Sequence, residues 1–431
     1  MLLFSFGLEA KEYPEIAGLN LRTKKQKLAL GAVLGNIWKH GTKPIYSNYL
    51  RNERNLPQIY NPSNIGNKPL RYALFALRDL GLIHIQKGIP KHYRGEDGQS
   101  EKPKLTAIMA SPELVNLLRE AITTSQISEA EPIYIYFKCA DKKKDYFLHY
   151  ESCAFTQRVH REMDEYCRFM QKQLITHDGE PLDEYHVIRT FRDWGKNGSL
   201  LYGGRAWHSV MGMRKEDRPR ILINGEKTVA LDYPASGPNI LYLMMTDSRL
   251  SPLGDPYDVA GIERPAVKQC LTIMSNTPNI YAAKGAISKW LKTGKERIEA
   301  KPAARAAIRE FGSIMAVINA ILRRNKPIAP CLMKGKAMGQ HYQWLEANLV
   351  FHVAHKLSLI GIPAITVHDE FIVRARDKAI AEELMYSLWP ENLPTLATAP
   401  WNKTLQAQHK AAGEALEVRG KGKAAARLEA E

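Results

Sequence analysis

The chain has 431 residues, enough for two or three domains, and its 45% hydrophobic and 25% charged residues are ordinary proportions for a globular protein. No stretch approaches 18 consecutive apolar residues, and the first residues lack a signal-peptide pattern, so we expect neither a membrane span nor secretion. The net charge of +16 favours a polyanionic partner, with solubility alone as the alternative.

Five isolated cysteines without a Cys-x-x-Cys pair predict neither a disulfide framework nor a zinc site, which suits the cytoplasm. Positive charge is concentrated between residues 20 and 105, where sixteen Lys or Arg residues accompany only five acidic residues. This segment therefore holds most of the excess charge and is the expected contact for nucleic acid.

The pattern over residues 20–125 predicts a helix at 24–39, a second helix opened by Pro69, and two strands around a basic loop at 88–104. Helix, loop, helix and hairpin is the order of a winged-helix-like nucleic-acid-binding domain, which places its second helix in the major groove. A small helical interaction domain is the alternative. Three basic residues of the second helix are the predicted nucleic-acid contacts: Lys68, Arg71 and Arg78.

Residues 126–225 are interpreted as a hairpin, at 132–150, followed by a helical, thumb-like connector that includes a helix at 156–174. The stretch Gly203-Gly204-Arg205 joins glycines, which allow close backbone approach, to an arginine suited to phosphate. Arg205 is therefore a predicted nucleic-acid contact, and a plain surface loop is the alternative.

Two short apolar runs each carry an aspartate, Asp232 at the end of 228–232 and Asp369 within 364–373. Each run reads as a buried strand, and a buried carboxylate is costly unless a cation or a donor compensates it. If the two strands lie side by side, the carboxylates would hold two Mg²⁺ ions, with Mn²⁺ as an alternative, for phosphoryl transfer.

Between these runs, Arg264 and Lys268 are four residues apart and share one face of a predicted helix, to which Asn276 returns. A nucleoside triphosphate needs cations at its phosphates and a neutral contact near its base or sugar. Two solvated charges on a surface helix are the alternative.

The order of these motifs resembles motifs A, B and C of the family A nucleic-acid polymerase superfamily, as in reduced DNA polymerases of plasmids and mobile elements. It is also similar to single-subunit phage-type RNA polymerases. Asp232 matches the motif A aspartate, Arg264 and Lys268 match the motif B pair, and residues 367–370, Val-His-Asp-Glu, match motif C. Arg205 resembles the Gly-Arg element before motif A, whereas Asn276 stands where the family usually has an aromatic residue.

The resemblance implies an α+β fold: a reduced right-hand polymerase palm, built on an antiparallel sheet with helical fingers over 226–400, after the N-terminal winged-helix-like domain. A flexible tail is expected at 401–431. The implied activity is template-directed nucleotidyl transfer, with a DNA template and primer (RNA as a further option), dNTP or NTP substrates, and a small accessory protein as a candidate partner. The implied site residues are Asp232, Asp369 and Lys268 in catalysis; Asp232, Asp369 and Glu370 at the metals; Arg264, Lys268, Asn276, Gly237 and Tyr233 at the nucleotide; and Arg205 and His368 at the nucleic acid.

Gly237 lies five residues after Asp232, where family A DNA polymerases usually carry a glutamate that blocks the ribose 2′-hydroxyl. The pair Ser236-Gly237 is similar to single-subunit RNA polymerases and suits a primase-polymerase. Three alternatives remain: a single-subunit RNA polymerase, a non-catalytic DNA-binding replication or regulatory factor with an inactive palm, and a metal nuclease. For His368, a satisfied core histidine is the alternative.

Overall fold

The computed structural model describes residues 6–7, 16, 18–47, 65–86, 106–124, 128–129, 132–139, 147–182, 185–193, 200–246 and 254–398. The basic loop at 88–104 and the tail at 401–431 lie outside these ranges. The chain divides into two compact units, Met1–Cys153 with Lys196–Gly198 and Ala154–Gly195 with Ser199–Glu431. Helices and antiparallel sheets mix in the described residues, which confirms the α+β class.

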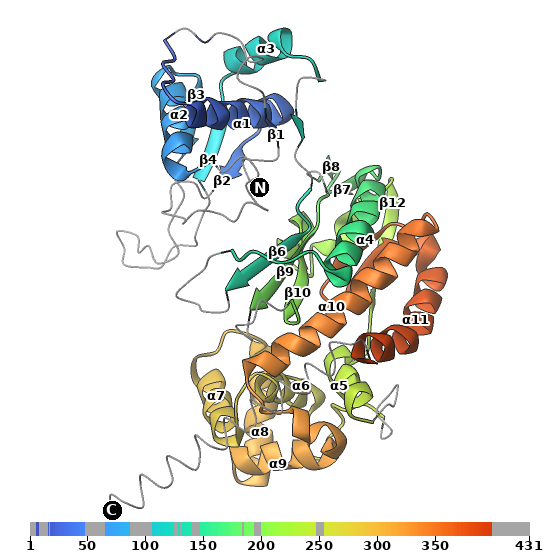
Figure 1. Cartoon of the computed structure of the whole chain (residues 1–431). Helices are drawn as coiled ribbons and strands as arrows, with labels where there is room; N and C mark the ends of the chain where they lie inside the picture. The colour runs from blue at the N-terminus through green and yellow to red at the C-terminus, as the bar shows by residue number, and fades with distance from the viewer. Residues whose placement is uncertain are drawn as a thin grey trace, which may run out of the picture. The chain divides into compact units, whose positions relative to one another are not determined.

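The first unit surrounds a three-stranded antiparallel sheet in the order β2-β4-β3 (Figure 1). Its predicted helices and its predicted strands on both sides of the basic loop are confirmed, with small shifts of their ends. The described elements are β1 (Phe6–Gly7), α1 (Lys24–His40), β2 (Ile45–Ser47), α2 (Asn67–Asp79), β3 (Ile83–Gln86), β4 (Thr106–Ala110), α3 (Pro112–Ala121), β5 (Ser128–Glu129) and β6 (Ile135–Cys139).

Local chemistry explains where these helices begin and end. Thr23 and Gln26 form a reciprocal capping box at the start of α1. Ser111 accepts a hydrogen bond from the Leu114 amide and caps α3. After α2, Gly81 takes a φ of +74°, which glycine adopts without steric cost, and the chain turns back into β3.

The hairpin expected at 132–150 is only partly present. The first strand was predicted at 132–137, but β6 begins three residues later, at Ile135, and the described part of the second strand reduces to an isolated bridge between Lys138 and Phe147. The charged turn at 141–145 lies outside the described residues.

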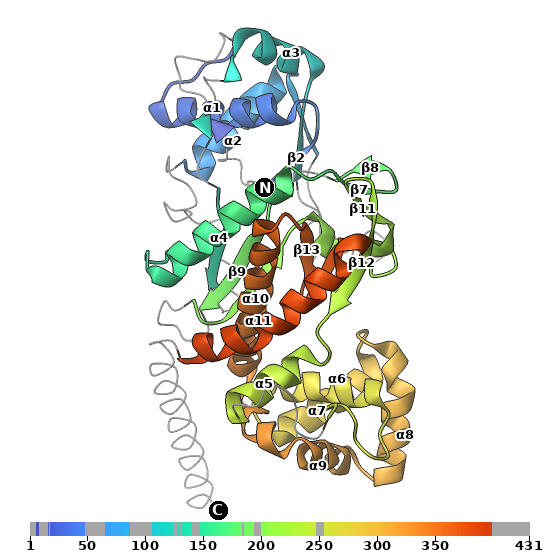
Figure 2. The same ribbon diagram turned by 90° about the vertical axis from the view of Figure 1, so that its right-hand side faces the viewer.

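The second unit is built on a six-stranded antiparallel sheet in the order β13-β14-β12-β11-β7-β8. Helices α10 and α11 lie across this sheet, as Figure 2 shows. The described elements are α4 (Ala154–Gln171), β7 (Ile175–His177), β8 (Glu180–Pro181), β9 (Ile188–Asp193), β10 (Gly203–Trp207), β11 (Ile221–Ile223), β12 (Glu226–Asp232), α5 (Ser236–Thr246), α6 (Arg264–Met274), α7 (Ile280–Thr293), α8 (Lys301–Phe311), α9 (Ile314–Arg324), α10 (Lys336–Leu359), β13 (Ala364–Val367), β14 (Glu370–Arg374) and α11 (Lys378–Thr398).

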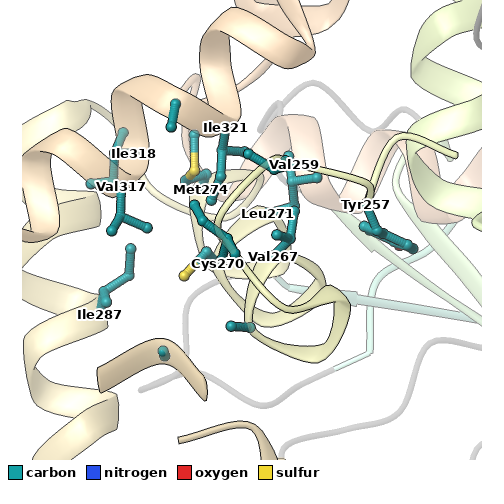
Figure 3. Close-up of a cluster of buried hydrophobic side chains, with 14 of the residues drawn as sticks. Tyr257, Val259, Val267, Cys270, Leu271, Met274, Ile287, Val317, Ile318 and Ile321 are labelled. Carbon is teal, nitrogen blue, oxygen red and sulfur yellow. The ribbon is translucent and has the colours of Figure 1, made fainter. Parts of the chain in front are cut away.

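Helices α6 to α9 pack around an apolar core of their own. Leu271 and Met274 of α6 lie beside Ile318 and Ile321 of α9 in this core (Figure 3). The buried residues of α6 face this core, and Arg264 and Lys268 are not among them. Both cations therefore lie on the other side of the helix. No helix among the described residues has the length and apolar content needed to cross a bilayer.

Candidate active site

Strand register brings Asp232 and Asp369 together. β12 pairs with β14 so that Asp232 lies opposite Glu370, and β13 pairs with β14 so that Val367 also lies opposite Glu370. The two residues between β13 and β14, His368 and Asp369, form the hairpin turn, and His368 has a φ of +60°. The turn therefore places Asp369 beside the end of β12, where its charge acts on the Asp232 carboxyl.

The two carboxylates repel each other when both are ionised. Asp232 is exposed at the end of β12, yet partial desolvation of its carboxyl first and the charge of Asp369 second raise its pKa to about 6, with a smaller contribution from Glu370 and with Lys268 opposing the shift. A divalent cation between the two carboxylates would remove this repulsion, so the donor set fits Mg²⁺. The described residues hold no ready-made cluster of three or more His, Cys, Asp or Glu side chains, so the remaining ligands would be water and substrate oxygens.

The raised pKa predicts a pH dependence of stability. In metal-free buffer, the free energy of unfolding should fall as pH rises from about 4 to about 6, because the unfolded carboxyl releases its proton near 3.8 and the folded one near 6. Asp369→Asn removes the repelling charge and should flatten this dependence. Urea unfolding across that pH range measures it; Glu382→Gln on α11 is the control, and an identical slope in all three proteins would contradict the pairing.

A serine and a buried glutamate hold Asp369 in place. Ser236 Oγ lies 2.7 Å from Asp369 Oδ2 and 3.1 Å from Glu346 Oε1. Arg205 Nη2 donates to Glu346 Oε2 at 2.6 Å, so the predicted nucleic-acid contact Arg205 is tied to the site through this ion pair. Burial raises the pKa of Glu346, and Arg205 opposes that shift.

Neither Ser236 nor Glu346 was predicted as a site residue. Glu346 had a signal in the sequence, because it is the single acidic residue of the mostly apolar helix α10. Such a residue is buried only with a partner, which Arg205 supplies here.

A cationic group from the α6 region faces the carboxylates. Burial and the charge of Arg297 lower the pKa of Lys268, while Asp232 and Asp369 act to raise it, so Lys268 lies within the field of both aspartates. Arg264 Nε donates to Asp255 Oδ2 at 2.7 Å and remains half exposed. Arg297 was not predicted, and nothing in its local sequence marks it.

An aromatic ring joins these cations. The Arg264 guanidinium lies 4.9 Å and the Lys268 ammonium 5.9 Å from the centroid of the Tyr257 ring. Cations stacked on an aromatic face keep their charge available to a ligand. The two aspartates could hold a divalent cation, and the cationic side chains beside them could bind the phosphates of one polyphosphate.

The other motif C residues have partners of their own. Glu370, predicted as a metal ligand, accepts a hydrogen bond from Arg218 Nη1 at 3.0 Å. His368 lies in the turn, where burial first and Arg205 second lower its pKa, so it is neutral at physiological pH. His368 is exposed in this turn, so the alternative of a core histidine is wrong.

Gly237 and Asn276 both lie against α10. A Cβ at Gly237 would lie 3.5 Å from Tyr342 Cε2, which is ordinary contact. Asn276 donates to the Thr272 carbonyl at 2.9 Å, and its Oδ1 fills the space that a side chain at Gly339 would need. The aromatic ring closest to Gly237 therefore comes from α10 and not from the position that Asn276 occupies.

The assignment of Tyr233 to nucleotide binding is corrected by its placement. Its side chain is buried, and its hydroxyl donates to the Met385 carbonyl of α11 at 2.9 Å. Successive strand residues point to opposite faces, so the neighbour of Asp232 turns away from the carboxylate pair and into the core.

In the first unit, the predicted contacts Lys68, Arg71 and Arg78 are all exposed on α2. Arg78 also bonds Asp79, its neighbour, at 2.6 Å. These residues belong to the first unit, whereas the carboxylate site belongs to the second.

No known protein-family model matches this chain, and no curated protein is significantly similar to it. The interpretation of both sites therefore depends on their geometry and chemistry.

Proposed function

We propose that the second unit is a template-directed nucleotidyltransferase, a DNA polymerase that also accepts ribonucleotides and so can act as a primase-polymerase. The observation that carries the proposal is the pair Asp232 and Asp369 on adjacent strand ends, with Lys268 in their field. Paired carboxylates opposite a cation suit the transfer of a phosphoryl group from a nucleoside triphosphate.

The residues of this chain divide the work. Asp232 and Asp369 would hold Mg²⁺, which when bound lowers the pKa of an attacking hydroxyl and neutralises the leaving group. Ser236 and the Arg205–Glu346 ion pair keep the Asp369 carboxylate in one orientation. Lys268 binds the phosphates of the incoming nucleotide and donates a proton to the departing pyrophosphate.

The arrangement supports the likeness to a reduced family A palm and fingers. An antiparallel sheet carries both aspartates, and a separately packed helical group carries Arg264 and Lys268. A metal nuclease would use the carboxylates equally well, but it would leave the cations beside Tyr257 without a triphosphate to bind.

The first unit, in this proposal, is a winged-helix-like domain that binds duplex DNA. The order helix, strand, helix, hairpin and the sheet order β2-β4-β3 support it. So does the exposed basic face of α2, whose charges are those that phosphates attract.

One assay separates the alternatives for the second unit. The full-length protein is incubated with Mg²⁺, primed or unprimed single-stranded DNA, and either dNTPs or NTPs. Extended or newly started strands support the proposal. Shortened strands indicate a nuclease, and binding without any product indicates a non-catalytic factor.

Sugar choice gives a further prediction. Gly237→Glu should reduce incorporation of ribonucleotides more than of deoxyribonucleotides, about tenfold more, because a glutamate side chain at the start of α5 would occupy the space of a 2′-hydroxyl. Gly237→Ala is the matched control, since its Cβ meets only ordinary contact with Tyr342. The ratio of kcat/KM values for paired NTP and dNTP substrates measures the effect; an equal loss of both would contradict it.

A further inference from the structure

Helix α2 has two distinct faces. Its buried face consists of Leu70, Ala73, Leu74 and Leu77, each at most 3% exposed. The opposite face carries residues at spacings of three, four and three along the chain: Lys68, Arg71, Phe75 and Arg78. An aromatic residue thus lies within a row of basic residues on the side of the helix that the core does not use.

Phe75 lies between two arginines. The guanidinium carbons of Arg71 and Arg78 are 5.7 Å and 4.6 Å from the centroid of its ring. These contacts orient both side chains without neutralising them, and Arg78 is also paired with its neighbour Asp79. Tyr72 is the other aromatic residue of α2, and its hydroxyl donates a hydrogen bond to the Asn20 carbonyl. Tyr72 is therefore not part of the row.

The row matches the repeat of duplex DNA. Seven residues separate Arg71 from Arg78, which is roughly 10.5 Å along a helix that rises 1.5 Å per residue. Base pairs repeat every 3.4 Å or so along the duplex, so the row spans about three of them. Phe75 lies near the middle of that span.

We propose that this face of α2 reads sequence in the major groove of duplex DNA, with Phe75 against the 5-methyl group of a thymine and Arg71 and Arg78 on flanking guanines. Arginine pairs with the O6 and N7 atoms of guanine, and an apolar side chain distinguishes thymine by its methyl group. Duplex RNA is a poor ligand because its major groove is too deep and narrow for a helix and its uracil lacks the methyl. The inference rests on the proposed DNA-binding role of the first unit and adds base specificity to it.

The test uses the full-length chain. From a pool of randomised duplexes it should enrich sites with a thymine flanked by guanines within about three base pairs. Replacing that thymine by uracil removes only the methyl group and should weaken binding about fourfold, the equivalent of one buried methyl. Phe75→Ala should bind both duplexes equally, whereas Lys68→Ala should weaken both alike and reduce the salt dependence.

The outcomes separate the two claims. Salt-sensitive binding with no thymine preference, or a Phe75→Ala variant that keeps the fourfold difference, overturns base readout and leaves duplex binding in place. Failure to bind any duplex removes both. The comparison of wild-type protein on thymine and uracil does not depend on the folding of any variant, and equal binding of the two duplexes overturns the inference by itself.

Discussion

Replacement of Asp232 or Asp369 by alanine is expected to lower the rate of nucleotide incorporation at least about a thousandfold, because each removes half of the only acidic pair placed to hold Mg²⁺ beside Lys268 in the described residues. Single-turnover extension of a primed template measures the effect. Binding of the template should change little, since both losses concern the chemical step.

Stability distinguishes loss of chemistry from loss of fold. Asp232→Ala removes a carboxylate that its neighbour repels, so the variant should be at least as stable as wild type at neutral pH without metal. Glu382→Ala changes a partly exposed acid on α11 that forms a weak pair with Lys378; it is the matched control and should keep full activity. An aspartate variant that retains more than about a tenth of wild-type activity would exclude the two-carboxylate mechanism.

Lys268→Met should lower kcat/KM for the incoming nucleotide about a hundredfold. It removes a cation that interacts electrostatically with both aspartates and is placed to bind the phosphates. Arg264→Met should cost less, about tenfold, since Arg264 is half exposed and already paired with Asp255. Steady-state kinetics with varied nucleotide and saturating primed template give both values.

The matched control for these variants is Lys292→Met, an exposed lysine in the last turn of α7. Its loss should leave kcat/KM unchanged. If Lys268→Met and Lys292→Met behaved alike, the phosphate-binding role of α6 would be refuted. If only affinity for the template fell, Lys268 would be a template contact instead.

Elements with strong local signals could be predicted from sequence alone. The helices at α1 and α2 follow apolar periodicity, and the run that ends in Asp232 forms β12. The run 364–373, expected to be one strand, is instead a hairpin of β13 and β14 with Asp369 in its turn, because the backbone reverses at His368. The proximity of Asp232 and Asp369 agrees with the prediction that the two segments lie side by side, although Asp232 is exposed and Asp369 only partly buried, so the predicted burial of both carboxylates was wrong.

The supporting residues could not be predicted in the same way. Glu346 meets Ser236 across 110 residues and Arg205 across 141, so no local pattern joins them. Arg218 reaches Glu370 across 152 residues. Such contacts are set by tertiary packing, which single-sequence periodicity does not contain.

Tyr233 shows the opposite failure. The resemblance implied a role for Tyr233 at the nucleotide, yet the alternation of a strand sends adjacent side chains to opposite faces. The ring lies instead between Phe371 and Tyr386, 6.1 Å and 6.3 Å away between centroids. Strand geometry, applied strictly, would have assigned it to the core.

The central claim is that Asp232 and Asp369 share a metal ion. Its most direct test is to measure Mn²⁺ binding to the full-length protein, without nucleotide, by electron paramagnetic resonance. Wild type should bind the ion more weakly as pH falls through about 6, since a proton then occupies Asp232. Asp232→Asn and Asp369→Asn should each weaken binding at least about tenfold. Equal binding by all three proteins, with no dependence on pH, would show that the two carboxylates do not share a metal.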